Sequence, residues 1–232
     1  CDDIAREYPH CQREIELISD ASRSCGREIV LSLSPGPAPV EHAEHLKKYA
    51  NLWRITDDFW DEWRLLKGMF ERAEKWCIHA APGHWPDADM LPVGALRQDY
   101  DPEDRTKFTE AEQRTMMTLW CMMRSPLMIG AELTKLDAFT KELLTNADLL
   151  AIQKESFCAH PLYTLADRAA WIAPRKDGKG VYLALFNLSD EEQEIFLPLG
   201  DAELPGGMAA TELWSGATAV AGDVLSAKLP AH

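Results

Sequence analysis

Hydrophobic positions in the first two thirds of the chain alternate between helical spacing and short continuous apolar runs. Ile15, Ile18 and Ala21 have helical spacing, and Gly26 is placed to end that helix. The longest helix is predicted over residues 59–76, where apolar side chains recur every three or four positions and form one face. The apolar runs between the helices are short enough to be buried strands.

Predicted strands and helices follow one another along this part of the chain. Strands are predicted over residues 29–33, 51–56 and 125–130, a loop over 82–94, and further helices over 40–49, 109–123, 136–144 and 147–153. This alternation indicates βα units and a parallel sheet. Together with an abrupt start at Cys1, the number of units predicts that residues 1–160 form the second half of a (β/α)8 TIM-type barrel. A complete, small doubly wound sheet is the alternative.

The remaining residues, 161–232, show no helical period. Strand-like segments cover residues 170–173, 181–186 and 194–197, and turn-forming residues lie between them at 176–180 and 187–190. We therefore predict a small antiparallel β-sandwich domain after the α/β part.

Composition and charge argue against nucleic acid as a partner and against a membrane-spanning segment. A formal charge of −14 disfavours nucleic acid, because an acidic chain repels phosphates. No apolar run reaches the length of a membrane span, so we predict no membrane segment. The six cysteines are scattered without a CxxC pair, and we expect most of them to be buried or free thiols. The compartment, cytoplasmic or secreted, and the oligomeric state, a homo-oligomer included, stay open.

Carboxylates recur where the predicted strands end, which is where parallel barrels place their catalytic groups. They are Asp2 and Asp3, Asp57 and Asp58, and Asp87 and Asp89. The nearby tryptophans would suit a sugar, since carboxylates supply an acid, a base and a nucleophile while apolar surfaces cover the ring. No metal or organic cofactor is needed for such chemistry.

Each of these features also has a simpler interpretation. Asp57 or Asp58 could cap the helix predicted from Phe59, and Asp87 and Asp89 could simply form turns. Cys77, His79, His84, Asp87 and Asp89 have the composition of a metal cluster but not the spacing of a known zinc or calcium site. Ser32 or Ser34 could be a nucleophile, although the Gly-x-Ser-x-Gly elbow is absent.

Four blocks in order resemble glycoside hydrolase family 27, which contains the α-galactosidases and α-N-acetylgalactosaminidases. Residues 53–58, Trp-Arg-Ile-Thr-Asp-Asp, resemble the segment in which an arginine precedes the acid/base aspartate by four residues. Residues 83–91 resemble the family's Gly-Gly-Trp-Asn-Asp-Pro-Asp-Met-Leu loop, and residues 119–130 and 143–153 resemble the segments that follow it. The resemblance covers nearly the whole chain and implies a TIM-type barrel with a noncatalytic β module.

The resemblance also implies roles for individual residues in a retaining α-glycosidase. Asp2 would be the nucleophile and Asp58 the acid/base, in a double displacement. Arg54 would contact a sugar hydroxyl, and Trp85, Asp89 and Met90 would line the pocket.

Two rival functions are a noncatalytic carbohydrate-binding relative and an unrelated α/β enzyme or binding domain. Retention of both Asp2 and Asp58 argues against the first of these, and the Trp53-Arg54 pair together with the Asp87/Asp89 loop argues against the second. Ser34 stands where galactosidases often carry a glutamate facing the sugar's 2-substituent. Because serine leaves room for an acetamido group, we lean slightly toward an N-acetylgalactosaminide substrate over a galactoside.

Overall fold

The computed structural model describes residues 9–34 and 36–232, and in the first part a parallel sheet is flanked by helices. Strands β1 (Ser32–Leu33), β2 (Leu52–Arg54) and β3 (Trp85–Asp87) lie side by side in chain order. The first helices are α1 (Gln12–Ser24), α2 (Ala43–Tyr49) with the 3-10 turn η1 (Val40–His42) before it, and α3 (Trp63–Trp76) with η2 (Cys77–His79) after it. Strands β1 and β2 are thus each followed by a helix and then by a parallel neighbour, as βα units require. The strand order does not reverse within the described residues, so the alternative of a doubly wound sheet gains no support.

Three sequence predictions need correction here. The helix predicted from Phe59 begins at Trp63; residues 59–62 are not helical, and the backbone N–H of Phe59 donates to the distant Asp89 carboxylate. A strand, β3, lies inside the predicted loop 82–94. Of the strand predicted over residues 29–33, only Ser32 and Leu33 are strand, because nothing in the described chain covers Val30, which is 70% exposed.

The strand predicted over residues 125–130 is reduced to a single parallel bridge between Leu91 and Ile129. The helix before it agrees well with the sequence: α4 (Glu110–Met123) begins at Thr109 with a capping box, in which Thr109 and Glu112 bond to each other's backbone N–H. The turn η3 (Leu133–Lys135) and helices α5 (Ala138–Thr145) and α6 (Ala147–Glu155) follow.

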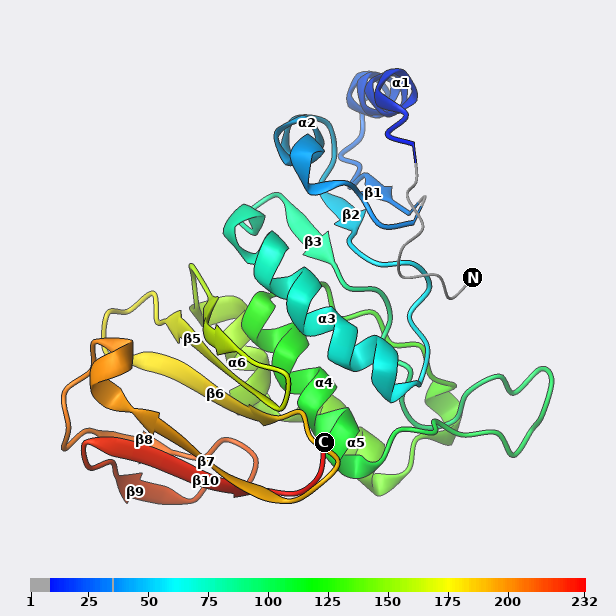
Figure 1. Ribbon diagram of the computed structural model, residues 1–232. Helices are drawn as coiled ribbons and strands as arrows, with labels where there is room; N and C mark the ends of the chain where they lie inside the picture. The colour runs from blue at the N-terminus through cyan, green and yellow to red at the C-terminus, as the bar shows by residue number, and fades with distance from the viewer. Residues whose placement is uncertain (1–8, 35) are drawn as a thin grey trace.

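The C-terminal part is antiparallel, as predicted. One sheet contains β4 (His160–Thr164), β5 (Arg168–Pro174) and β6 (Val181–Asn187). Two separate strand pairs accompany it: β7 (Gln193–Pro198) pairs with β10 (Val224–Leu229), and β8 (Ala209–Thr211) pairs with β9 (Thr218–Val220). The turn η4 (Leu199–Ala202) follows β7. Figure 1 shows these strands on one side of helices α3 and α4, with β1, β2 and β3 on the other.

Helices α3 and α4 join the two parts through a shared apolar core. Phe70 of α3 makes an edge-to-face contact with Phe186 of β6, with ring centroids 4.9 Å apart. Trp53 of β2 and Trp120 of α4 are both fully buried in the same cluster. Since burial of such large side chains contributes most of the stabilising free energy, the β strands and the parallel sheet support each other's packing.

Two further observations concern the cysteine side chains and the hydropathy of the helices. The five cysteines of the described chain, Cys11, Cys25, Cys77, Cys121 and Cys158, are free thiols. Among the described helices, none combines the length and the apolar character needed to cross a bilayer.

Candidate functional site

Arg54, Asp58 and Asp89 of the predicted site gather at the carboxyl ends of parallel strands β2 and β3. Arg54 is the last residue of β2 and lies opposite Asp87, the last residue of β3. Leu33 of β1 lies opposite Trp53, so Ser34 follows β1 at the same edge of the sheet. This common edge exists because parallel strands in register end together.

Arg54 binds two carboxylates with a single nitrogen. Its Nη2 lies 2.9 Å from Oδ2 of Asp89 and 3.4 Å from Oδ1 of Asp58. The Arg54 side chain is only 9% exposed, so its charge is desolvated and is balanced by these two partners. The arginine thereby holds together two segments that lie about 30 residues apart in the chain.

Asp89 is the centre of the hydrogen-bond arrangement. Besides binding Arg54, its Oδ2 accepts the backbone N–H of Phe59 at 2.7 Å. Its own N–H donates to Oδ1 of Asp87 at 2.8 Å, and its carbonyl accepts the indole N–H of Trp120 at 3.1 Å. Asp89 adopts this position with φ of 74°, in the left-handed region where aspartate is tolerated better than most residues. Asp89 therefore fixes the backbone directly after Asp58.

Asp87 is buried behind this arrangement. Burial raises the pKa of its carboxyl group, while the hydrogen bond from the Asp89 N–H and the charge of Arg54 act in the opposite direction. Its side chain is thus a buried acceptor that shapes the turn after β3.

Asp58 differs from the other two because its side chain is 68% exposed. The interpretation of Asp57 or Asp58 as a helix cap is wrong: α3 begins after Glu62, and no side chain caps it. Instead, Oδ1 of Asp57 accepts the backbone N–H of Asp58 at 3.0 Å. An accessible carboxylate within reach of a buried arginine can exchange a proton with a bound molecule.

Met90 follows Asp89 and lies directly against Gly130. A Cβ atom placed on Gly130 would be 2.5 Å from Sδ of Met90, so the methionine can occupy this position only because residue 130 has no side chain. The sequence prediction did not include Gly130. The only signal for it was that a glycine ends the apolar run 127–130.

The other predicted residues have different surroundings. Trp85 lies at the amino end of β3, where the guanidinium of Arg124 sits 4.5 Å from its ring centroid. Ser34 is exposed. Asp2 lies outside the described residues, as does Asp3. The described chain contains no group of three or more His, Cys, Asp or Glu side chains placed to hold a metal ion, so the composition-based metal cluster does not assemble.

Family models match two consecutive parts of the chain. The model described as alpha galactosidase A matches residues 4–155, and the model described as the alpha galactosidase C-terminal beta sandwich domain matches residues 166–232. An α-galactosidase from Oryza sativa subsp. japonica is 25% identical over the whole of this chain and 53% of its own length.

Solved structures are similar over the same span. A GH27 β-L-arabinopyranosidase from Geobacillus stearothermophilus superposes with a TM-score of 0.91 and 42% identity, over 99% of this chain and 54% of that chain. A Bacillus halodurans C-125 protein named as a putative α-N-acetylgalactosaminidase has a TM-score of 0.81 and 38% identity, over 100% of this chain and 55% of that chain. The chain thus spans about half the length of the relatives it matches.

These matches extend through both parts of the chain. The chain belongs to the GH27 α-galactosidase family.

Proposed function

We propose that the complete protein is a retaining glycoside hydrolase that removes a terminal pyranose with the galactose ring configuration. The observation that carries this proposal is Arg54, buried at the carboxyl edge of a parallel sheet and bound to both Asp58 and Asp89. Supporting it, an α-galactosidase and a GH27 β-L-arabinopyranosidase match the chain over 99% or more of its length. The family's architecture would make residues 1–160 the second half of its barrel and residues 161–232 its β module.

The proposed reaction is a double displacement. Asp2 attacks the anomeric carbon while Asp58 donates a proton to the leaving oxygen, and water then attacks the glycosyl-enzyme with Asp58 acting as base. The exposed Asp58 carboxylate can reach both a sugar and solvent, which suits an acid/base that works in both steps. Asp89 and Arg54 would hold Asp58 in place and offer polar contacts to the sugar, with Met90 as a further pocket residue. Trp85, at the amino end of β3 against Arg124, lies away from this edge and has no proposed contact with the sugar.

The substrate is proposed from the pocket and the relatives together. α-D-Galactopyranose and β-L-arabinopyranose share their ring configuration and differ only in the hydroxymethyl group on C5. The 42% identity to an arabinopyranosidase therefore makes the pentoside a second candidate beside the galactoside. Ser34, small and exposed at the same edge as Arg54, supports the third candidate, the N-acetylgalactosaminide.

The experiment compares hydrolysis of nitrophenyl α-galactoside, α-N-acetylgalactosaminide and β-L-arabinopyranoside by the complete protein, followed by mass spectrometry after inactivation with a 2-fluoro or 5-fluoro sugar. We expect turnover of at least one glycoside, and a covalent label on Asp2. In a retaining enzyme, the Asp2 and Asp58 carboxyl groups should lie about 5–5.5 Å apart. Binding without turnover of any glycoside would instead identify a noncatalytic carbohydrate-binding relative.

A further inference from the structure

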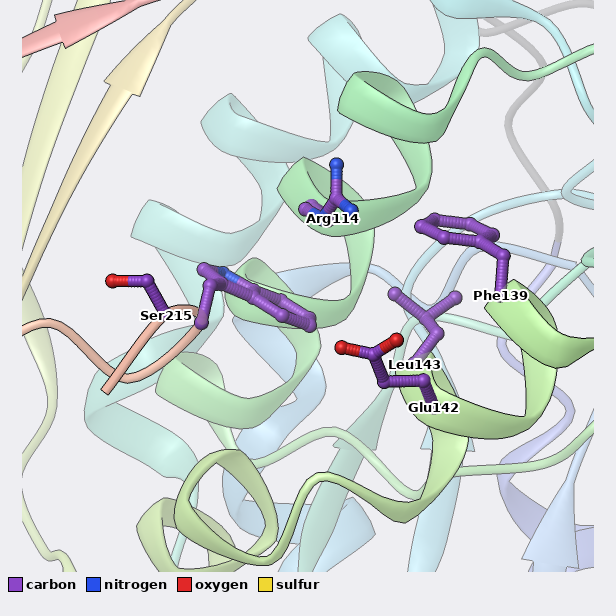
Figure 2. Close-up of a pocket in the computed structure, with 6 residues that line it drawn as sticks. Arg114, Phe139, Glu142, Leu143 and Ser215 are labelled. Carbon is purple, nitrogen blue, oxygen red and sulfur yellow. The ribbon is translucent and has the colours of Figure 1, made fainter. Parts of the chain in front are cut away.

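A cavity lies where helices α4 and α5 meet the turn between β8 and β9. Its volume is about 320 Å³, and it is lined by Arg114, Phe139, Glu142, Leu143, Trp214 and Ser215. Figure 2 shows Arg114 on one helix, Phe139 and Glu142 on another, and Ser215 on the separate β8–β9 turn, around a common space. None of these residues belongs to the Arg54 site.

The aromatic wall of this cavity is fixed in place before any ligand binds. The indole N–H of Trp214 donates to Oγ1 of Thr118 at 3.2 Å, and the backbone N–H of Trp214 donates to the Glu212 carboxylate at 2.8 Å. The side-chain amide of Asn146 donates to the carbonyl of Leu213 at 3.0 Å. Because the turn is bound on both sides, the half-buried indole loses little conformational entropy when a ligand packs on it.

The polar groups of the cavity carry both signs of charge. The guanidinium of Arg114 lies 4.9 Å from the centroid of the Phe139 ring and forms an ion pair with Glu110 at 3.5 Å. The Glu142 carboxylate is exposed and makes no hydrogen bond or ion pair with the described part of the chain. The cavity therefore offers hydrogen-bond donors from one side and free acceptors from another.

This combination selects a class of ligand. An anion would pair with Arg114 but would be repelled by Glu142 and Glu110, and the chain's charge of −14 adds to that repulsion. A cation would be repelled by the positive charge of the Arg114 guanidinium. A neutral ligand with several hydroxyl groups can accept from the arginine and donate to the carboxylate, while its C–H face packs on the indole. The volume lies at the lower end of the range for small-molecule sites, about 300–1,000 Å³, which suits a single sugar unit.

We propose that this cavity is a secondary saccharide site that binds a pyranose ring of a neutral oligosaccharide or polysaccharide. The choice of a saccharide over another neutral polyol rests on the proposed function, since such a site would hold the polymer that the catalytic site trims. Trp214 would supply the stacking surface, and Arg114, Glu142 and Ser215 the hydroxyl contacts. The rings of Trp214 and Phe139 are held by α4 and α5, so binding would not require movement of the helices.

The test is calorimetric titration of the complete protein with raffinose, in an Asp58→Asn background that prevents turnover. We expect a weak binding phase beside that of the catalytic site. Glu142→Ala and Arg114→Met should each weaken this phase about tenfold, the usual effect of losing a hydrogen bond to a charged group. Glu103→Ala, which removes another exposed carboxylate outside the cavity, is the matched control and should leave the phase unchanged.

Glu142 is exposed, so its replacement should not affect folding, and nitrophenyl glycoside hydrolysis by the Glu142→Ala protein should equal that of the unmodified protein. The proposal of a secondary site is wrong if the titration shows no weak phase, or if neither Glu142→Ala nor Arg114→Met weakens that phase. The proposed function is tested separately: if it is wrong, the complete protein does not hydrolyse nitrophenyl glycosides, and this result is independent of the effect of Glu142→Ala on the titration.

Discussion

The carboxylate of Asp89 lies 2.9 Å from the guanidinium of Arg54, closer than Asp58 at 3.4 Å. The same Asp89 carboxylate also accepts the N–H of Phe59, the residue after Asp58. The proposed acid/base is therefore positioned from both sides by Asp89, once through a charge and once through the backbone.

Asp89→Asn should lower kcat about 10- to 100-fold through displacement of Asp58, because the amide weakens the charge pairing with Arg54 while keeping the left-handed backbone accessible. Asp89→Ala removes the acceptor as well and places an alanine at φ of 74°, so it should also lower the thermal midpoint. Steady-state kinetics and thermal unfolding of both variants separate these effects. Unchanged kcat in Asp89→Asn would show that Asp89 does not position Asp58.

Asp58→Asn should remove general acid catalysis. We expect turnover to fall by about two to four orders of magnitude on substrates with poor leaving groups, and by less on activated aryl glycosides that leave without protonation. Rates for a natural-type oligosaccharide and a dinitrophenyl glycoside give the comparison. An equal loss on both would identify Asp58 as structural.

Ser34→Glu should move substrate preference toward sugars with a free 2-hydroxyl group. A carboxylate accepts a hydrogen bond from that hydroxyl and crowds an acetamido group, a difference worth about 1–3 kcal/mol. The measured quantity is the ratio of kcat/KM for the galactoside and the N-acetylgalactosaminide, with Ser34→Ala as the uncharged control. If the ratio stays constant in Ser34→Glu, residue 34 does not contact the 2-substituent.

Gly130→Ala should push Met90 out of its present position. The added Cβ would lie 2.5 Å from Sδ of Met90 and 3.1 Å from its Cγ, so the flexible side chain must move. If Met90 lines the pocket, KM should rise about tenfold with a smaller change in kcat. Gly222→Ala, where a Cβ meets nothing within 4 Å, is the control. In a Met90→Ala background the Gly130→Ala effect should disappear, and its persistence would exclude the methionine as the cause.

Asp61→Asn should destabilise the protein by about 2–3 kcal/mol, since it breaks a buried, two-point ion pair. Asp61 accepts from both terminal nitrogens of Arg97, at 2.8 and 3.0 Å, and is 3% exposed. Burial acts to raise the pKa of Asp61, but the hydrogen bonds from Arg97 and from the Lys107 backbone outweigh it and leave that pKa below the ordinary 3.8.

A depressed pKa means that this stabilisation is complete above the pKa of the unfolded chain and is lost as pH falls through the lower, folded value. The difference in thermal midpoint between the Asp61→Asn and unmodified proteins should therefore stay constant from neutral pH down to about 4 and shrink below it. Asp99→Asn, an exposed aspartate in the same loop region, should show no difference at any pH. If the difference in thermal midpoint between the Asp61→Asn and unmodified proteins grew as the pH was lowered, the lowered pKa of Asp61 would be contradicted.

Local features of the fold were predictable because their causes are local. The start of α4 at Thr109 follows from a capping box between residues three apart, and α1 ends near Gly26 for the same kind of reason. Strands β5 and β6 were visible as apolar runs between turn residues. The resemblance to GH27 was also carried by short contiguous blocks, and the family models and relatives confirm it.

Features that depend on long-range contacts were missed or misplaced. Helix α3 starts at Trp63, and the segment before it is bound to Asp89 through the N–H of Phe59, a contact across 30 residues that no local pattern records. Strand β3 was hidden because Pro86 lowers strand propensity, yet it pairs opposite Trp53 as an edge strand of the described sheet.

The sequence by itself determined that this chain has an α/β part and an antiparallel β part, because hydrophobic periodicity is written in consecutive positions; the link between Arg54 and Asp58 came from the resemblance of residues 53–58 to the GH27 segment. Only the tertiary structure decided that Asp89 binds both Arg54 and the backbone after Asp58, and that Trp214 faces Arg114 and Glu142 across a shared cavity. These arrangements arise when distant segments pack together, so their geometry is fixed by the buried core and not by the order of residues within any one segment.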